Sequence, residues 1–236
     1  MLDPIDERHR PVASDEPVPV PRTPVLIELA PTSRAEIVAV THLDPDAPAR
    51  SRTDYLSAKR LCCHEYAERY PDYAIGVEEV HDRHACVLFG RDATTGRVAG
   101  TLRVCFDTGA GLPLEPSLGP EVETLRRCGL RLAEPRRFVI RDPGAAVTAP
   151  FRAYLSAIYQ IAKLHDIDVY LMQVRTGRAG FYRRVCAAAD LDSGRAADGC
   201  VNLAWNLRRT PRRFFRAFGA DQSALERYLR TRGAGR

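Results

Sequence analysis

The chain has 236 residues, 45% of them hydrophobic, which is enough for one sizeable core and too little for two independent domains. No stretch approaches the roughly 20 apolar residues of a membrane span, and the N-terminus lacks the charged and then apolar pattern of a secretory signal. We therefore expect a soluble, cytoplasmic, single-domain protein.

The net charge of +5 comes almost entirely from arginine, since Lys59 and Lys163 are the only lysines. Arginine forks match the geometry of phosphate and carboxylate groups. From Leu207 to the C-terminus there are nine arginines against Asp221 and Glu226. Nucleic acid, an acidic carrier protein or water alone remain open as the partner of this basic segment.

The seven cysteines are scattered, and several stand in apolar runs, where a free thiol behaves as a small hydrophobe. We expect them to be reduced. Cys62, Cys63 and His64 are adjacent, and His81 and His84 follow, but no second pair at zinc-finger spacing accompanies them. The sequence therefore predicts no metal site.

Three regions follow one another along the chain. Residues 1–33 are rich in proline and charge and are expected to be largely disordered, apart from a candidate edge strand at Val25–Leu29. Residues 34–207 carry the folded domain, and residues 208–236 form a basic helical extension. In chain order the domain should contain a strand at 36–43, a helix at 54–70, strands at 85–89 and 97–106, a loop at 107–120, a short helix at 121–127, a strand at 136–140, a helix at 148–165, a strand at 168–174, a helix at 178–189 and a strand at 201–207.

The clearest signals are a helix and a hairpin. Apolar residues recur at helical spacing between Asp54 and Tyr70, and Pro71 ends the pattern. Two β-rich runs flank the polar, glycine-containing turn 92–96. The whole order of elements predicts an α+β fold, a mostly antiparallel mixed sheet flanked by helices.

Four segments, in this order, resemble GNAT-like acyltransferases. Val98–Val104 is similar to the strand that carries a Gly-Thr-Leu-Arg signature, and Glu134–Ile140 to the Glu-x-x-Arg-Phe strand of N-acyl amino acid synthases and acyl-homoserine lactone synthases. Leu155–Ala162 and Phe181–Arg184 are similar to two helical motifs of the same group. The resemblance covers roughly residues 50–190 and implies a GNAT-like fold.

The resemblance implies roles for individual side chains. Glu134 would act as the base near the attacking amine, and Tyr182 would protonate the leaving thiolate. Arg137 and Arg103 would bind substrate or fix the local geometry. Strand alternation places Glu134 and Arg136 on one face and Arg137 on the other, unless a bulge intervenes. A strand-end salt bridge for Glu134 and a core tyrosine for Tyr182 are the structural alternatives.

Two further sets of residues match binding motifs of related enzymes. Glu79 and Asp82 have the acidic spacing that precedes the hairpin in homoserine lactone synthases and would hold an acceptor ammonium, although an ordinary solvated turn has the same pattern. Arg141, Gly144 and Ala146 fit the loop that binds the pyrophosphate of coenzyme A.

The implied activity is transfer of a medium or long acyl chain from a thioester to the α-amine of an amino acid. The donor would be an acyl-phosphopantetheine, on acyl carrier protein or coenzyme A, with no permanently bound cofactor. Residues 208–216, with Phe214, Phe215 and Phe218, would dock the acidic carrier. Acyl-homoserine lactone synthesis is the nearest alternative. It is disfavoured because those synthases normally carry a tryptophan early in the chain, whereas the only tryptophan here is Trp205. The alternative that is not an enzyme is a GNAT-like binding module, or a protein that binds nucleic acid through the C-terminal arginines. For the preferred acyltransferase reading we expect no nucleic-acid partner.

Overall fold

The computed structural model describes residues 25–27, 35–41, 49–70, 80–92, 95–141, 148–191 and 199–218. Within these ranges eight strands form one sheet in the order β1-β2-β3-β4-β5-β6-β8-β7. The strands are β1 (Val25–Ile27), β2 (Ala35–Thr41), β3 (Ala85–Asp92), β4 (Val98–Phe106), β5 (Leu132–Ile140), β6 (Val169–Arg175), β7 (Ala189–Asp190) and β8 (Cys200–Asn206). The helices are α1 (Ala49–Arg69), α2 (Glu115–Arg127), α3 (Thr148–Leu164), α4 (Thr176–Cys186) and α5 (Arg212–Phe218), with short 3-10 helices η1 (Val80–His84) and η2 (Leu207–Arg209).

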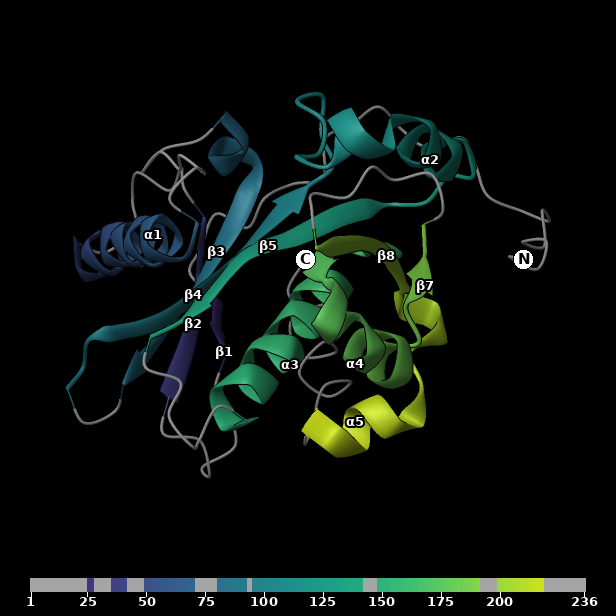
Figure 1. Cartoon of the computed structure of the whole chain (residues 1–236). Coiled ribbons are helices and arrows are strands. Elements are labelled where there is room, and N and C mark those ends of the chain that lie inside the picture. Colours follow the sequence, from purple (N-terminus) through teal and green to yellow (C-terminus); the bar gives the residue numbers. More distant parts are fainter. Residues whose placement is uncertain are drawn as a thin grey trace, which may run out of the picture.

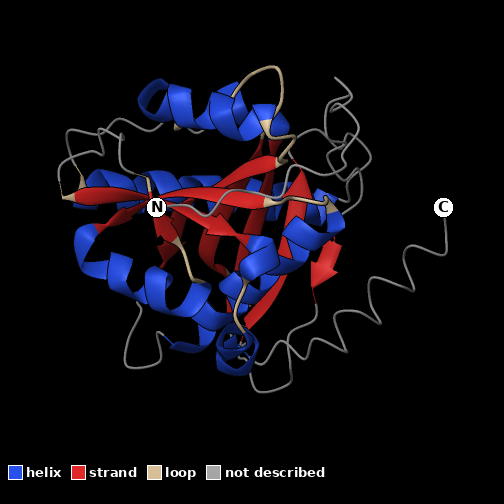
Figure 2. Ribbon diagram, turned by 90° about the vertical axis from the view of Figure 1, so that its right-hand side faces the viewer, coloured by secondary structure: helices blue, strands red, loops and turns tan. Residues whose placement is uncertain are grey.

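Helices cover both faces of the sheet. In Figure 1, α1 and α2 lie on one side of it and α3, α4 and α5 on the other, and Figure 2 shows the same layers from the side. The strands alternate accordingly: Val87 and Phe89 pack under α1, whereas Cys86 and Leu88 face the larger core beneath α3 and α4. The sheet is antiparallel except at the β5–β6 pair, so the predicted mostly antiparallel mixed sheet is confirmed.

Most predicted elements are present within a few residues, and β1 occupies the expected edge position. The predicted loop 107–120 is wrong over its last residues, because α2 begins at Glu115 rather than at residue 121. Pro116 lies in the first turn, where a proline is compatible with a helix. The backbone then kinks at Leu118, just before Pro120. Pro116, Gly119 and Pro120, which indicated a loop, thus belong to a kinked helix.

Strand β5 contains the bulge that decides the layout of the site. Leu102 of β4 is opposed by two residues of β5, since Thr101 pairs with Val139 and Arg103 with Arg136. At the bulge Arg137 adopts a φ of 58°, a left-handed conformation that costs a residue with a β-carbon about 1–2 kcal/mol. The alternation shifts by one residue beyond it.

Strands β5 and β6 separate after a short contact. Their parallel register contains only the pairs Leu132 with Val169 and Ala133 with Tyr170 in the part of the chain that the structure describes. Each strand then continues, to Ile140 and to Arg175, without a further pair between them. The backbones therefore part from Glu134 onward.

None of the helices described is long and apolar enough to cross a lipid bilayer.

Candidate active site

Glu134 lies where β5 begins to part from β6. It is 2% exposed, and its Oε2 accepts a hydrogen bond from the backbone N–H of Leu114 at 2.8 Å. Its Oε1 is 3.2 Å from Nη1 of Arg136, so both side chains share one face of the strand, as predicted. Burial raises the pKa of Glu134 to about 7, against the opposing effect of Arg136, the Leu114 N–H, Arg103 and Arg137. A carboxyl with a pKa near neutrality is suited to accept a proton at physiological pH.

The loop that supplies the Leu114 N–H is fixed by ion pairs from α2. Arg126 donates from Nε to Asp107 at 2.9 Å and from Nη1 to Glu115 at 2.6 Å. The Glu115 carboxylate also accepts a hydrogen bond from the backbone N–H of Leu112 at 3.0 Å. Arg126 therefore holds both ends of the segment that bonds Glu134, and its hydrogen bonds to Glu115 lower the pKa of that carboxyl.

A buried ionic triad lies beside Glu134 on the same face. Asp82 has no exposed surface, and Nζ of Lys59 donates to its Oδ2 at 2.6 Å. Nη1 of Arg103 donates to the other carboxylate oxygen, Oδ1. Both oxygens of Asp82 are thus bonded within the protein, so the carboxylate faces Arg103 and Lys59 rather than an open site for an ammonium group. The charges of this triad compensate each other only while all three groups are present.

The bulge brings Arg137 to the same face as Glu134. Its guanidinium carbon is 5.1 Å from the centre of the Tyr66 ring of α1, and Val139 packs in the cluster beneath α1. Phe138 points the other way, with its ring centre 5.1 Å from that of Tyr154 on α3. The expectation of an arginine on the opposite face is therefore replaced by two consecutive arginines beside the glutamate, because the bulge shifts the alternation.

Tyr182 approaches from the other layer. It lies on α4, packs against the core beneath α3 and α4, and has a pKa raised to about 12, mainly by burial. The structure thus joins Glu134, Arg103, Arg137 and Asp82 on one face, with Tyr182 on the opposite one.

Of the remaining predicted site residues, the structure describes Arg141 and does not describe the other three. Arg141 is exposed at the end of β5, where its N–H donates to the carbonyl of Ala99 at 2.8 Å. Glu79, Gly144 and Ala146 lie outside the described residues. Their roles stay predictions.

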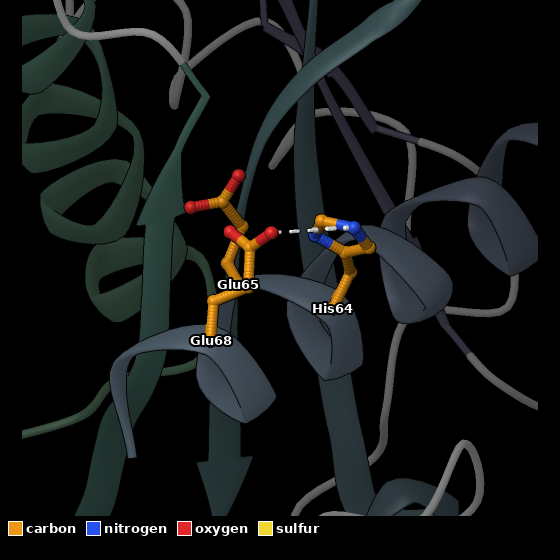
Figure 3. A group of neighbouring side chains, drawn as sticks. All are labelled: His64, Glu65 and Glu68. Carbon is orange, nitrogen blue, oxygen red and sulfur yellow. Dashed lines mark ion pairs between the residues drawn. The ribbon is translucent and has the colours of Figure 1, made fainter. Parts of the chain in front are cut away.

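His64, Glu65 and Glu68 are the group of possible metal ligands found in the described part of the chain (Figure 3). His64 lies 3.6 Å from Glu68, and Glu65 lies 2.7 Å from Arg69, in pairs four residues apart on α1. Such pairs are ordinary on a helix surface.

Lys59 and Arg136 are members of the site that were not predicted from the sequence. Lys59 stands in the apolar stripe of α1 between Tyr55 and Cys62, and a lysine in such a stripe indicates a buried partner. Arg136 had no comparable signal, because strand alternation alone does not reveal which charges pair.

Comparison with known proteins identifies the family. A family model described as "N-acyl amino acid synthase FeeM" matches residues 54–207. The chain belongs to the N-acyl amino acid synthase family. No curated protein sequence matches it.

Solved structures agree with this N-acyl amino acid synthase fold. FeeM, an N-acyl amino acid synthase from uncultured soil microbes, has 17% identity and a TM-score of 0.56, over 75% of this chain and 93% of that one. The acyl-homoserine lactone synthase LasI has 17% identity and a TM-score of 0.52, over 74% and 91%. The CoA-dependent acyl-homoserine lactone synthase MesI has 18% identity and a TM-score of 0.51, over 77% and 94%.

Membership of the N-acyl amino acid synthase family makes this chain an acyltransferase with the expected GNAT-like α+β fold. The expected resemblance is confirmed, and the non-catalytic alternative is set aside.

Proposed function

We propose that the protein transfers a medium or long acyl chain from a phosphopantetheine thioester to the α-amine of an amino acid, with Glu134 as the general base. The observation that carries the proposal is the buried carboxyl of Glu134, with a pKa of about 7, at the point where β5 and β6 part. Such a base is half ionised near pH 7, where it accepts a proton without demanding a strongly basic environment. Donors of this kind go with a cytoplasmic location.

In the proposed reaction the thioester enters between β5 and β6. The amine nitrogen attacks the thioester carbon, a C–N bond forms, and the proton of the nitrogen passes to Glu134, directly or through a water. Backbone N–H groups along the parted strands stabilise the oxyanion of the tetrahedral intermediate. The C–S bond then breaks, and the Tyr182 hydroxyl protonates the thiolate. No enzyme nucleophile is required, because positioning and charge stabilisation suffice.

The arginines around Glu134 support binding of an amino acid. Arg137 is the residue we assign to the acceptor carboxylate, because the bulge turns it toward the glutamate and a guanidinium matches a carboxylate in shape and charge. Arg103 is 3% exposed and is bonded to Asp82. The triad of Arg103, Asp82 and Lys59 therefore serves to position the neighbouring Arg137 and Glu134. Glu79 keeps its predicted role toward the ammonium.

For the donor we propose acyl carrier protein, with coenzyme A as the alternative. Phe214 is fully buried and Phe215 packs against Tyr159, so these two rings anchor α5 to the core and do not form the expected docking contact. The arginines of the same region, by contrast, lie on the protein surface. The exposed arginines of α4, η2 and α5 are Arg178, Arg183, Arg184, Arg208, Arg209, Arg212, Arg213 and Arg216. Of these, Arg183 pairs with Asp190 and Arg208 with Asp168. Such a surface suits an acidic carrier.

The activity is tested by release of free thiol. The wild-type protein should release thiol from an acyl thioester only when amino acids are present, and Glu134→Gln should lose about a hundredfold or more in kcat. Glu123→Gln, which changes an exposed acid of α2, is the matched control and should keep the wild-type rate. Retained activity in Glu134→Gln would contradict the proposed base. Release that depends on S-adenosylmethionine instead of amino acids would favour the lactone synthase alternative.

The donor is tested by comparing acyl carrier protein with coenzyme A carrying the same acyl chain. Arg212→Glu with Arg213→Glu should raise KM for the acyl carrier protein at least about tenfold and leave KM for the acyl-CoA unchanged, since negative charges would then repel each other at the docking face. Equal effects on both donors would argue against a carrier surface on α5.

A further inference from the structure

The β6–β8 pair carries a group of polar side chains on the face of the sheet that holds Glu134. Leu171 of β6 packs beneath α2, so strand alternation points Gln173 and Arg175 to that same side. Gln173 stands opposite Asn202 of β8 in the register, and its Nε2 donates to Oδ1 of Asn202 at 3.2 Å. Figure 1 shows α1 and α2 on this side of the sheet. Gln173, Arg175 and Asn202, here named the amide–arginine group, therefore share a face with the proposed base.

The amide–arginine group lies across the parted strands from the residues proposed for acyl transfer. The last pair between β5 and β6 joins Ala133 to Tyr170. Counted three residues onward along both strands, Arg136 stands level with Gln173, where the described backbones no longer pair. A substrate held beside Glu134 thus has the arginines of β5 on one side and the amide–arginine group on the other.

Helix α1 connects the two sides through a pair of tyrosine rings. Tyr66 and Tyr70 stand one turn apart, with ring centres 5.4 Å apart. The guanidinium of Arg137 on β5 faces the Tyr66 ring. The guanidinium carbon of Arg175 on β6 is 4.8 Å from the centre of the Tyr70 ring. Nη1 of Arg175 also lies 3.3 Å from the place that a β-carbon at Gly199 would take. Arg175 is therefore positioned between an aromatic ring and bare backbone.

Asn202 supplies the observation that points to a ligand. The residue is 3% exposed, and its Nδ2 has no hydrogen-bond partner among the residues that the structure describes. A buried N–H donor without a partner costs free energy, so such a donor beside a reaction site indicates an oxygen that arrives with a ligand. Neither β6 nor β8 contains an acidic residue, so these strands present no like charge to an incoming carboxylate. The amide–arginine group therefore offers hydrogen-bond donors and positive charge to an anion.

We propose that the amide–arginine group selects an acyl acceptor with an acidic side chain, glutamate or aspartate. This inference rests on the proposed acyl transfer and names the class of amino acid that its acceptor site takes. With the amine beside Glu134 and the α-carboxylate at Arg137, the side-chain carboxylate crosses to Arg175 and to Nδ2 of Asn202. A guanidinium and a carboxamide N–H both donate to carboxylate oxygens. An apolar side chain would instead leave the Asn202 donor unpaired and remove water from Arg175 without compensation.

The selection is tested by thiol release from one acyl thioester with glutamate, aspartate, glutamine or leucine as the acceptor. For the wild type, kcat/KM should be about a hundredfold higher with the better acidic amino acid than with leucine, because two charge-assisted hydrogen bonds discriminate. Arg175→Gln should lower this ratio about thirtyfold, and Asn202→Leu about tenfold. Arg127→Gln, which changes an exposed arginine of α2, is the matched control and should keep the wild-type ratio. The ratio is taken within each variant, so a loss of folded enzyme does not change it.

The acceptor series separates this inference from the proposed acyl transfer. Leucine or glutamine used as well as the acidic amino acids, or a ratio unchanged in both variants, would overturn the selection and leave acyl transfer standing. If no amino acid elicits thiol release, the acyl transfer fails instead, and calorimetric titration of the full chain with glutamate and with aspartate decides the inference. At least about tenfold weaker binding to Arg175→Gln than to the wild type supports the carboxylate site. Equal binding to both proteins, or binding to neither, refutes it.

Discussion

Replacing Glu134 by glutamine should change how the stability of the protein responds to pH. Burial raises the carboxyl pKa from 4.5 to about 7. Below pH 4.5 the group is protonated in both the folded and the unfolded chain, so its favourable effect is fully present. As the pH rises through about 7, the folded protein must ionise a buried group that the unfolded chain ionises more easily, and this stability is lost. At about 1.4 kcal/mol per pH unit, the difference between the two pKa values corresponds to about 3 kcal/mol.

The assay is urea unfolding of the wild type and of Glu134→Gln at several pH values between about 4 and 8, the interval set by the two pKa values. Glutamine can still accept the Leu114 N–H but cannot ionise. The wild type should therefore lose about 3 kcal/mol relative to the variant across this range, while the titration of all other groups cancels in the comparison. A difference in unfolding free energy that stays constant with pH would refute the reasoning, because it would mean that the carboxyl is well solvated.

Three further predictions concern the buried triad, the packing at Gly100 and the proposed acid Tyr182. Asp82→Ala should lower the unfolding free energy by about 3–5 kcal/mol, since it leaves two buried cations uncompensated, whereas Asp190→Ala, in an exposed pair, should cost less than about 1 kcal/mol. Gly100→Ala would put a β-carbon 2.9 Å from a buried tyrosine hydroxyl and should destabilise by about 1–3 kcal/mol, while Gly109→Ala meets nothing within 4 Å; equal melting temperatures would contradict this. Tyr182→Phe should lower kcat about a hundredfold with little change in KM, and an unchanged kcat would exclude the proposed acid.

The extent to which the fold follows from sequence depends on the kind of signal. The β3–β4 hairpin and α3 were predictable because alternation and helical spacing are local properties. The start of α2 was not, because Pro116 and Pro120 mark turns more often than kinked helices. Strand β7 was missed as well, since two residues carry no periodicity.

The site divides in the same way. Glu134 and Arg103 were named from motifs that stand in the sequence. The pairing of Arg103 with Asp82 and Lys59 joins three elements, and nothing local reports such contacts. The conformation of Arg137 was also hidden, because glycine is the usual mark of a positive φ.

The bulge of β5 makes this strand sensitive to length in a way that ordinary strands at a sheet edge are not. Deleting the single residue Arg137 would restore regular pleating and remove its guanidinium from the face of the glutamate, while Phe138 would stay on the opposite face. Chimaeras built by exchanging this strand with one from a relative must therefore preserve the count of residues between Glu134 and Val139, even where every side chain is allowed to vary.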